Sequence, residues 1–169
     1  GFPLHPVSLF VLERLSKRVA QNERTFFTYL VSDEENALFK QLEQFDTQEF
    51  HFVGLDLIYD YFEQNIRSYY RTDEIYETYK KLQYALNKLR SDGPVRTQIK
   101  ILKTIAVINM IADTTVLASD RVTLKYVTDE RETVIDEVID QLEQMKIIKF
   151  MRQYGYYDFF DSSVYDFDA

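Results

Sequence analysis

Apolar residues recur every three or four positions along most of this chain, and this spacing constrains its fold more than any other feature. Segment 73–89 is the clearest case, because its apolar residues lie on one stripe of a helix: Ile75, Tyr79, Leu82, Leu86 and Leu89. The same spacing predicts helices over residues 6–19 and 98–111. Pro6 suits a first helical turn, since its missing N–H needs no partner there. We therefore expect a mainly helical fold.

Further helices are predicted where capping residues precede apolar positions. A short helix is expected over residues 23–30, and a second one after Ser32, with Glu35 three residues later completing a capping box. Asp56 is expected to cap the helix that carries Tyr59, Phe62 and Ile66. With these elements, the N-terminal part of the chain, residues 2–91, is predicted to be a helical region.

Residues 91–94, Ser-Asp-Gly-Pro, interrupt the pattern most clearly, because Gly and Pro together end a helix and redirect the backbone. We place a domain boundary there and expect a second domain over residues 95–165. Its first helix is 98–111, its second begins at 119–121, and its third is capped by Thr128 or Asp129. Three helices in this order are the first part of a winged-helix pattern.

Two segments after the third helix are predicted to form a β-hairpin. Residues 147–152 and 156–160 are rich in apolar and aromatic side chains, and Gly155 lies at the turn between them. Three helices followed by a hairpin predict a winged-helix-like domain. The expected fold class is therefore mainly α, with a small β-hairpin as the wing.

Composition limits the classes of function. The chain has 169 residues with 13 Tyr and 13 Phe, which is ample for a packed core. Its net charge of −8 argues against nucleic acid, because binding to phosphates depends on a basic surface. No apolar run reaches the roughly 20 residues that cross a membrane, so we expect no membrane partner. The absence of cysteine suits a cytoplasmic protein.

The third helix of the second domain carries the most distinctive polar residues. Its polar positions include four acids, Asp136, Glu137, Asp140 and Glu143, which would repel the phosphates of a DNA groove. They are candidates for docking a protein partner, and a solvated acidic face is the alternative. The wing offers three cations as candidate contacts to a DNA backbone, namely Lys146, Lys149 and Arg152.

Catalytic and metal-binding patterns are not evident. The four glycines, Gly1, Gly54, Gly93 and Gly155, are too scattered to form a phosphate-binding loop of the G-x-x-x-x-G-K-[ST] type. The only histidines, His5 and His51, lie far apart and do not make a zinc site. We therefore expect no catalytic residue, no metal site and no bound cofactor in this chain.

One stretch of the chain has a family resemblance. Leu4-His5-Pro6-Val7-Ser8-Leu9-Phe10 opens an apolar helix that leads into Gln21-Asn22-Glu23-Arg24 and the aromatic run of residues 25–30. This stretch resembles the region after the nucleotide-binding core of large bacterial AAA+ type P-loop ATPases, many of them associated with mobile elements or phage defence. A winged-helix module often follows that core, and residues 95–165 are loosely similar to it.

The resemblance implies that this chain is a fragment of a larger ATPase, containing its helical lid and winged helix. The ATPase core of the same parent chain would then be a partner, and that core would bind ATP and Mg²⁺. The fragment itself would be non-catalytic and would couple nucleotide state to a protein or DNA partner.

The resemblance also implies a role for two residues, Arg24 and Asn22, in sensing the nucleotide. A fixed guanidinium on the lid can reach the γ-phosphate and stabilise its charge. In the alternative, Arg24 pairs with Glu23, Glu34 or Glu35, and Asn22 caps the short helix. Two other functions stay open at this point: a stand-alone winged-helix DNA-binding regulator and a protein–protein interaction module.

Overall fold

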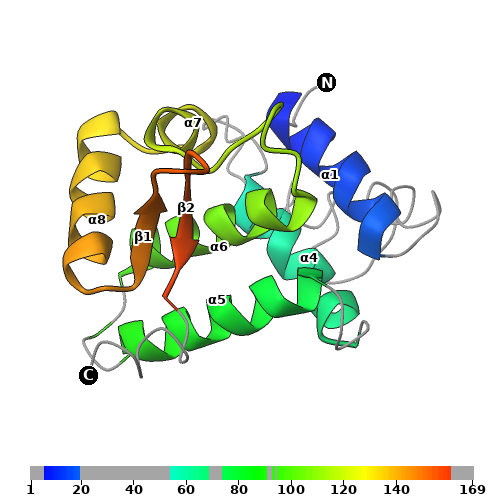
Figure 1. Cartoon of the computed structure of the whole chain (residues 1–169), viewed down its shortest axis with the longest axis horizontal. Helices are drawn as coiled ribbons and strands as arrows, with labels where there is room; N and C mark the ends of the chain where they lie inside the picture. Colours follow the sequence, from blue (N-terminus) through cyan, green and yellow to red (C-terminus); the bar gives the residue numbers. More distant parts are fainter. Residues whose placement is uncertain (1–5, 20–53, 69–73, 91–92, 94, 161–169) are drawn as a thin grey trace, which may run out of the picture.

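The computed structural model describes residues 6–19, 54–68, 74–90, 93 and 95–160. These residues form six helices followed by one hairpin (Figure 1). The elements are α1 (Pro6–Val19), α4 (Leu55–Ser68), α5 (Glu74–Arg90), α6 (Arg96–Ile111), α7 (Arg121–Val127), α8 (Glu132–Gln144), β1 (Ile148–Met151) and β2 (Tyr156–Phe159). The prediction of a mainly helical fold with a small β-hairpin is confirmed.

Most predicted helices are present with small shifts at their ends, and α1 has the predicted bounds. The prediction that Asp56 caps a helix is wrong, because α4 begins one residue earlier and Asp56 lies in its first turn. The carbonyl of Gly54 accepts the first hydrogen bond there, from the N–H of Ile58 at 3.3 Å. The predicted helices at 23–30 and after Ser32 lie outside the described residues.

The predicted cap of α8 is also wrong, since the N-cap residue is Arg131 rather than Thr128 or Asp129. Thr128 instead ends α7, where its N–H donates to the carbonyl of Leu124 at 3.2 Å. The connection between the two helices is therefore longer than the capping pattern suggested. By contrast, α7 begins as expected, because the Asp120 side chain accepts a hydrogen bond from the N–H of Thr123 at 2.8 Å.

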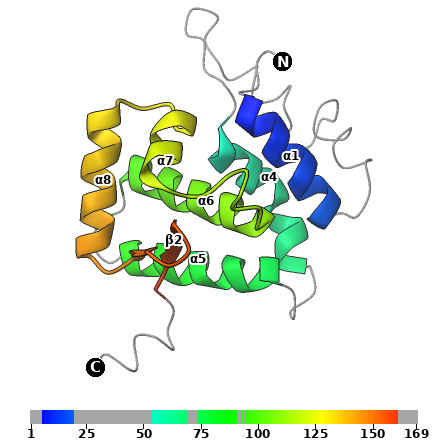
Figure 2. The ribbon, with the colours of Figure 1, turned by 45° about the horizontal axis from the view of Figure 1, so that its top comes forward.

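Helix α6 lies at the centre of the fold, with α1 and α4 on one side and α7 and α8 on the other (Figure 2). The five consecutive residues 104–108 are all buried. Because a helix turns by about 100° per residue, five consecutive buried positions surround it rather than lie on one stripe. Helices from both sides of the predicted boundary at 91–94 thus pack on α6, and their buried residues belong to one hydrophobic cluster.

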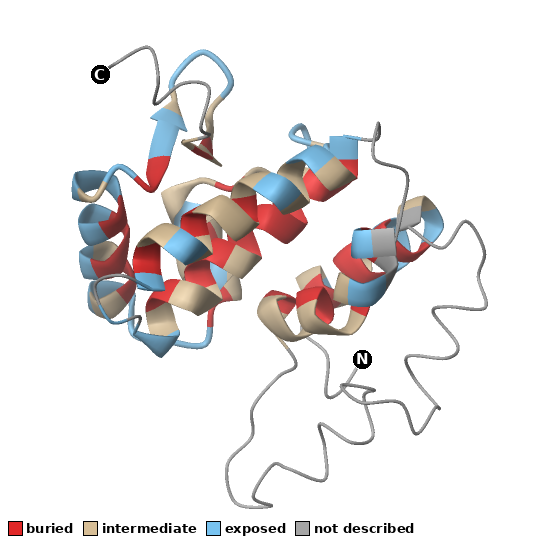
Figure 3. Ribbon diagram, turned by 90° about the horizontal axis from the view of Figure 1, so that it is seen from below, coloured by how far each residue is buried: buried red, intermediate tan, exposed pale blue. Residues whose placement is uncertain are grey.

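Helix α8 packs on α6 through Ile135, Val138, Ile139 and Leu142, and its exposed residues face outward (Figure 3). Lys146 follows it in a left-handed conformation with φ of 56°. The N–H groups of Lys146 and Ile147 donate to the carbonyls of Glu143 and Leu142, both at 3.0 Å. These two bonds form a Schellman motif, which ends α8 and directs the chain into β1.

The hairpin is antiparallel, and its register pairs Ile148 with Phe159 and Lys149 with Asp158. Gly155 has φ of 78° in the turn, as its predicted turn position requires. Ile148 and Phe159 are buried, so one face of the hairpin completes the core. The opposite face contacts α5, where the Lys81 ammonium lies 3.2 Å from the Asp158 carboxylate.

Candidate functional site

The guanidinium of Arg121, at the start of α7, binds three carboxylates of α8. Its Nη1 atom lies 2.8 Å from Oδ1 of Asp136, and its Nη2 atom lies 2.9 Å from Oδ1 of Asp140 and 3.3 Å from Oε1 of Glu143. Spacings of four and three residues place these acids on one side of a helix. Partial burial alone would lower the pKa of Arg121, but the hydrogen bonds that it donates to Asp136 and Asp140 raise its pKa above the ordinary value.

A second cation of α7 joins the same cluster. The Lys125 ammonium lies 2.8 Å from Oδ2 of Asp136, so the two oxygens of this carboxylate bind two different cations. Hydrogen bonds from Lys125 and then from Arg121 lower the pKa of Asp136. Asp136 is therefore ionised at neutral pH and holds α7 against α8.

Tyr157 of β2 extends the cluster to the hairpin. Its hydroxyl donates to Oε1 of Glu143 at 2.8 Å and lies 3.4 Å from Nη2 of Arg121. Burial, and then the hydrogen bond to Glu143, raises the pKa of Tyr157 to about 12. The Tyr157 backbone is also held, since its N–H donates to the Ser119 carbonyl at 2.8 Å and its carbonyl accepts from Nδ2 of Asn109 at 2.9 Å. The cluster thus joins α7, α8 and β2.

The four acids predicted to dock a partner do not share one environment. Asp136, Asp140 and Glu143 converge on Arg121, whereas Glu137 is exposed and lies outside this cluster. The sequence did not point to Arg121 or Lys125 as their partners. The four-residue spacing of these two cations on a short helix was the available signal, because it places both on one face of α7.

The outward face of α8 is the side opposite its buried residues. The periodicity of the helix places Thr133, Glu137, Asp140 and Gln144 there, and all four are exposed. None of them is a cation. The side chain of Asp140 remains 65% exposed although it binds Arg121, so a partner can still reach its second oxygen.

The three hairpin cations are exposed but do not form one face with α8. Lys146 follows the C-cap of α8, Lys149 lies beside Asp158 across the hairpin, and Arg152 begins the turn. The Lys146 carbonyl accepts a hydrogen bond from Nζ of Lys88 at 3.1 Å, which attaches the end of α8 to α5. These three cations therefore lie on three different segments: the connection after α8, strand β1 and the hairpin turn.

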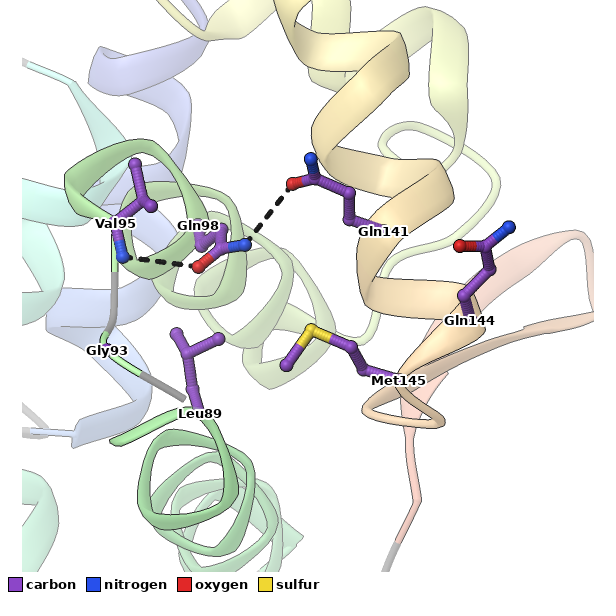
Figure 4. A pocket seen from close by; sticks show the side chains of 7 residues that line it. All are labelled: Leu89, Gly93, Val95, Gln98, Gln141, Gln144 and Met145. Atoms are coloured by element: carbon purple, nitrogen blue, oxygen red, sulfur yellow. Dashed lines mark hydrogen bonds between the residues drawn. The ribbon is translucent and has the colours of Figure 1, made fainter. Parts of the chain in front are cut away.

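A hollow of about 420 Å³ lies on the other flank of α8, where the end of α5 and the start of α6 meet it. Figure 4 shows the seven side chains or backbone positions that line it: Leu89, Gly93, Val95, Gln98, Gln141, Gln144 and Met145. Buried Gln98 accepts a hydrogen bond from the N–H of Val95 and donates to Oε1 of Gln141, both at 3.2 Å. No pattern in the sequence predicted this hollow.

Arg18 connects α1 to the far end of α6. Its guanidinium donates to the carbonyls of Met110 and of Ile111, the second at 3.1 Å. These carbonyls belong to the last turn of α6, where a cation stabilises the negative end of the helix dipole. Arg18 is separated in the sequence from Met110 by 92 positions and from Ile111 by 93 positions, and this contact was not predicted.

Asn22 and Arg24, the two residues predicted to sense nucleotide, lie outside the described residues. Among the described residues, no group of three or more His, Cys, Asp or Glu side chains could hold a metal ion. None of the described helices is long and apolar enough to cross a membrane.

The chain matches no protein-family model, no curated protein and no solved structure.

Proposed function

We propose that this chain is a non-catalytic module that docks a protein partner on the outward face of α8. The observation that carries the proposal is the chemistry of that face, which presents Glu137 and Asp140 and no cation. In a three-helix domain with a hairpin, the third helix is the one expected to enter a DNA groove. Here it would bring two carboxylates toward the phosphates, so a protein partner is favoured over DNA.

The nearby cations do not reverse this preference. Arg121 and Lys125 already bind Asp136, Asp140 and Glu143, and their charge is thereby offset within the chain. Affinity for DNA comes largely from cations that displace counterions from phosphates. A partner with Lys or Arg opposite Glu137 and Asp140 fits this face better. Each exposed ion pair would contribute about 0–1 kcal/mol and would orient the partner during encounter.

Coupling to a larger P-loop ATPase is the second part of the proposal, and it comes from the resemblance. What supports it in the described residues is the position of α1, which ends at Val19, just before Asn22 and Arg24. Arg18 binds the end of α6, and α6 packs against α8. A nucleotide-dependent movement after α1 would therefore reach the docking helix through α6.

Site-specific photo-crosslinking in the full-length protein, in its own cells, tests the docking face. A benzophenone amino acid would replace Glu137 or Gln144, with exposed Gln64 of α4 as the control position. We expect a light-dependent protein adduct from the two α8 positions and not from Gln64. Equal adducts from all three positions, or none from α8, would contradict the proposal.

Two further measurements separate the alternatives. If the module belongs to an ATPase, the adduct yield from position 137 will differ between cells depleted of ATP and untreated cells. If it is a DNA-binding regulator instead, fluorescence anisotropy with a duplex DNA will show salt-dependent binding that the K149A/R152A variant loses. We expect no such DNA binding.

A further inference from the structure

The hollow between α5, α6 and α8 adjoins the docking face, because Gln144 belongs to both. Its rim residues Val95 and Gln144 are exposed, so it opens to solvent and can hold part of a longer chain. A cavity of about 420 Å³ is within the range of natural ligand sites, roughly 300–1,000 Å³. The chemistry of its walls indicates what it would hold.

The apolar wall comes from three different elements. Leu89 is buried in the last turn of α5, Val95 precedes α6 and is 54% exposed, and Met145 follows α8. Together they provide a surface for one branched apolar side chain. Met145 adds adaptability, since an unbranched thioether can adjust to different shapes.

The polar wall consists of amides with unused hydrogen-bonding groups. The Gln98 amide donates a hydrogen bond to the side-chain oxygen of Gln141 (Figure 4). This bond does not use either N–H group of the Gln141 amide. Within the described part of the chain, the Gln144 amide makes no hydrogen bond, so it offers both donors and an acceptor. Primary amides pair equally well with the N–H and C=O groups of an extended peptide.

None of the seven described residues that line the hollow is Asp, Glu, Lys or Arg, although 28% of the chain is charged. A charged ligand would lose hydration on entering and gain no counter-charge. Phosphate-bearing ligands and nucleic acids are therefore poor candidates, and a neutral amide-containing ligand is the best one.

We infer that this hollow binds an extended, uncharged peptide segment of the protein partner, with one branched apolar side chain against Leu89, Val95 and Met145. The backbone of the segment pairs with the amides of Gln141 and Gln144. The inference deepens the proposed function and rests on it for the origin of the peptide. The acidic face of α8 would bind basic residues of the same partner, and the hollow would fix its register.

The test uses the full chain and N-acetyl-leucine-N-methylamide as the probe, with two-dimensional ¹H–¹⁵N NMR as the readout. Millimolar probe should shift the side-chain amide signals of Gln141 and Gln144 and the backbone amides of Val95 and Met145. The corresponding lysine and glutamate amides should bind at least about tenfold more weakly, because their charges stay unpaired. Equal shifts with all three probes, or none at the hollow, would overturn the inference.

The Q141L/Q144L variant should lose most of the leucine-probe shifts while the rest of its spectrum is preserved. The matched control is Gln153→Leu, an exposed glutamine in the hairpin turn, which should leave binding unchanged. Probe binding that persists in Q141L/Q144L would also overturn the inference. The two proposals can fail separately: crosslinks from position 137 without probe binding reject only the hollow, and probe binding without crosslinks rejects the docking face.

Discussion

The two flanks of α8 belong to one helix, yet they are held by different chemistry. One flank binds α7 and β2 through ions, with Arg121 and Lys125 facing Asp136, Asp140 and Glu143. On the other flank, a hydrogen bond between the neutral amides of Gln98 and Gln141 joins α8 to α6 beside an open hollow. The acids of the charged flank bind cations within the chain, although the Asp140 side chain stays 65% exposed, whereas the described amides of the other flank keep unpaired hydrogen-bonding groups. The acids of this helix thus differ in what they contact, and their sequence spacing alone does not separate them.

The largest loss of stability is expected from L142A, because Leu142 belongs to the buried face of α8 that lies between the two flanks. Leu142 is fully buried, so the variant leaves a cavity and should lower the free energy of unfolding by about 2–5 kcal/mol. Urea unfolding followed by circular dichroism would measure it. If L142A costs less than 1 kcal/mol, α8 is not packed on α6 as described.

The second largest effect is expected on the charged flank, from R121A. Removing the guanidinium leaves the carboxylates of Asp140 and Glu143 close together without their cation. Because these groups are partly exposed, we expect a loss of about 1–2 kcal/mol in unfolding free energy.

R121K should recover part of that loss, since a lysine keeps the charge but not the planar fork that binds several acids. R152A removes an exposed hairpin arginine as a control and should change stability by less than about 0.5 kcal/mol. Equal stabilities of R121A and R152A would show that the cluster does not hold α7 to α8.

A smaller effect on stability, which depends on pH, distinguishes the two flanks further. The charged flank contains the titratable Tyr157, whereas the amides of Gln98 and Gln141 on the other flank do not titrate. The pKa of Tyr157 is raised from 10.0 to about 12 in the folded protein. A raised pKa stabilises the fold below the unfolded value and the benefit is lost as pH rises through the folded value. The wild type should therefore lose stability between about pH 10 and pH 12.

The Y157F variant provides the comparison for this pH dependence. Its unfolding free energy should be lower than that of the wild type at pH 8, and the difference should shrink toward pH 12. Urea titrations at several pH values would measure both. A constant difference over this range would mean that folding does not raise the pKa of Tyr157.

The smallest effect is expected from Q141A on the amide flank. Gln141 is exposed and its one bond joins two neutral amides, so its loss should cost no more than about 1 kcal/mol. Stability near that of the wild type, measured by urea unfolding, would sharpen the contrast with R121A. A loss as large as that of R121A would remove the distinction between a structural flank and a binding flank.

The elements that were predictable depend on local patterns. Helix α1 has the predicted bounds, and Gly155 lies in the hairpin turn, because spacing and turn chemistry act over a few residues. The two wrong caps, at Asp56 and at Thr128 or Asp129, arose where the local pattern allowed more than one register. The end of α8 was harder still to predict, since the left-handed residue that follows the helix is Lys146 rather than glycine.

The sequence by itself determined the class of the fold and the acidic character of α8, since periodicity and charge are written directly in the order of residues. Only the tertiary structure decided which acids are paired. Arg121 meets Asp136, Asp140 and Glu143 because α7 packs on α8, and Arg18 reaches the end of α6 from more than ninety residues away. The hollow likewise exists only where α5, α6 and α8 meet. Such contacts depend on the angles and distances between helices, which local sequence does not encode.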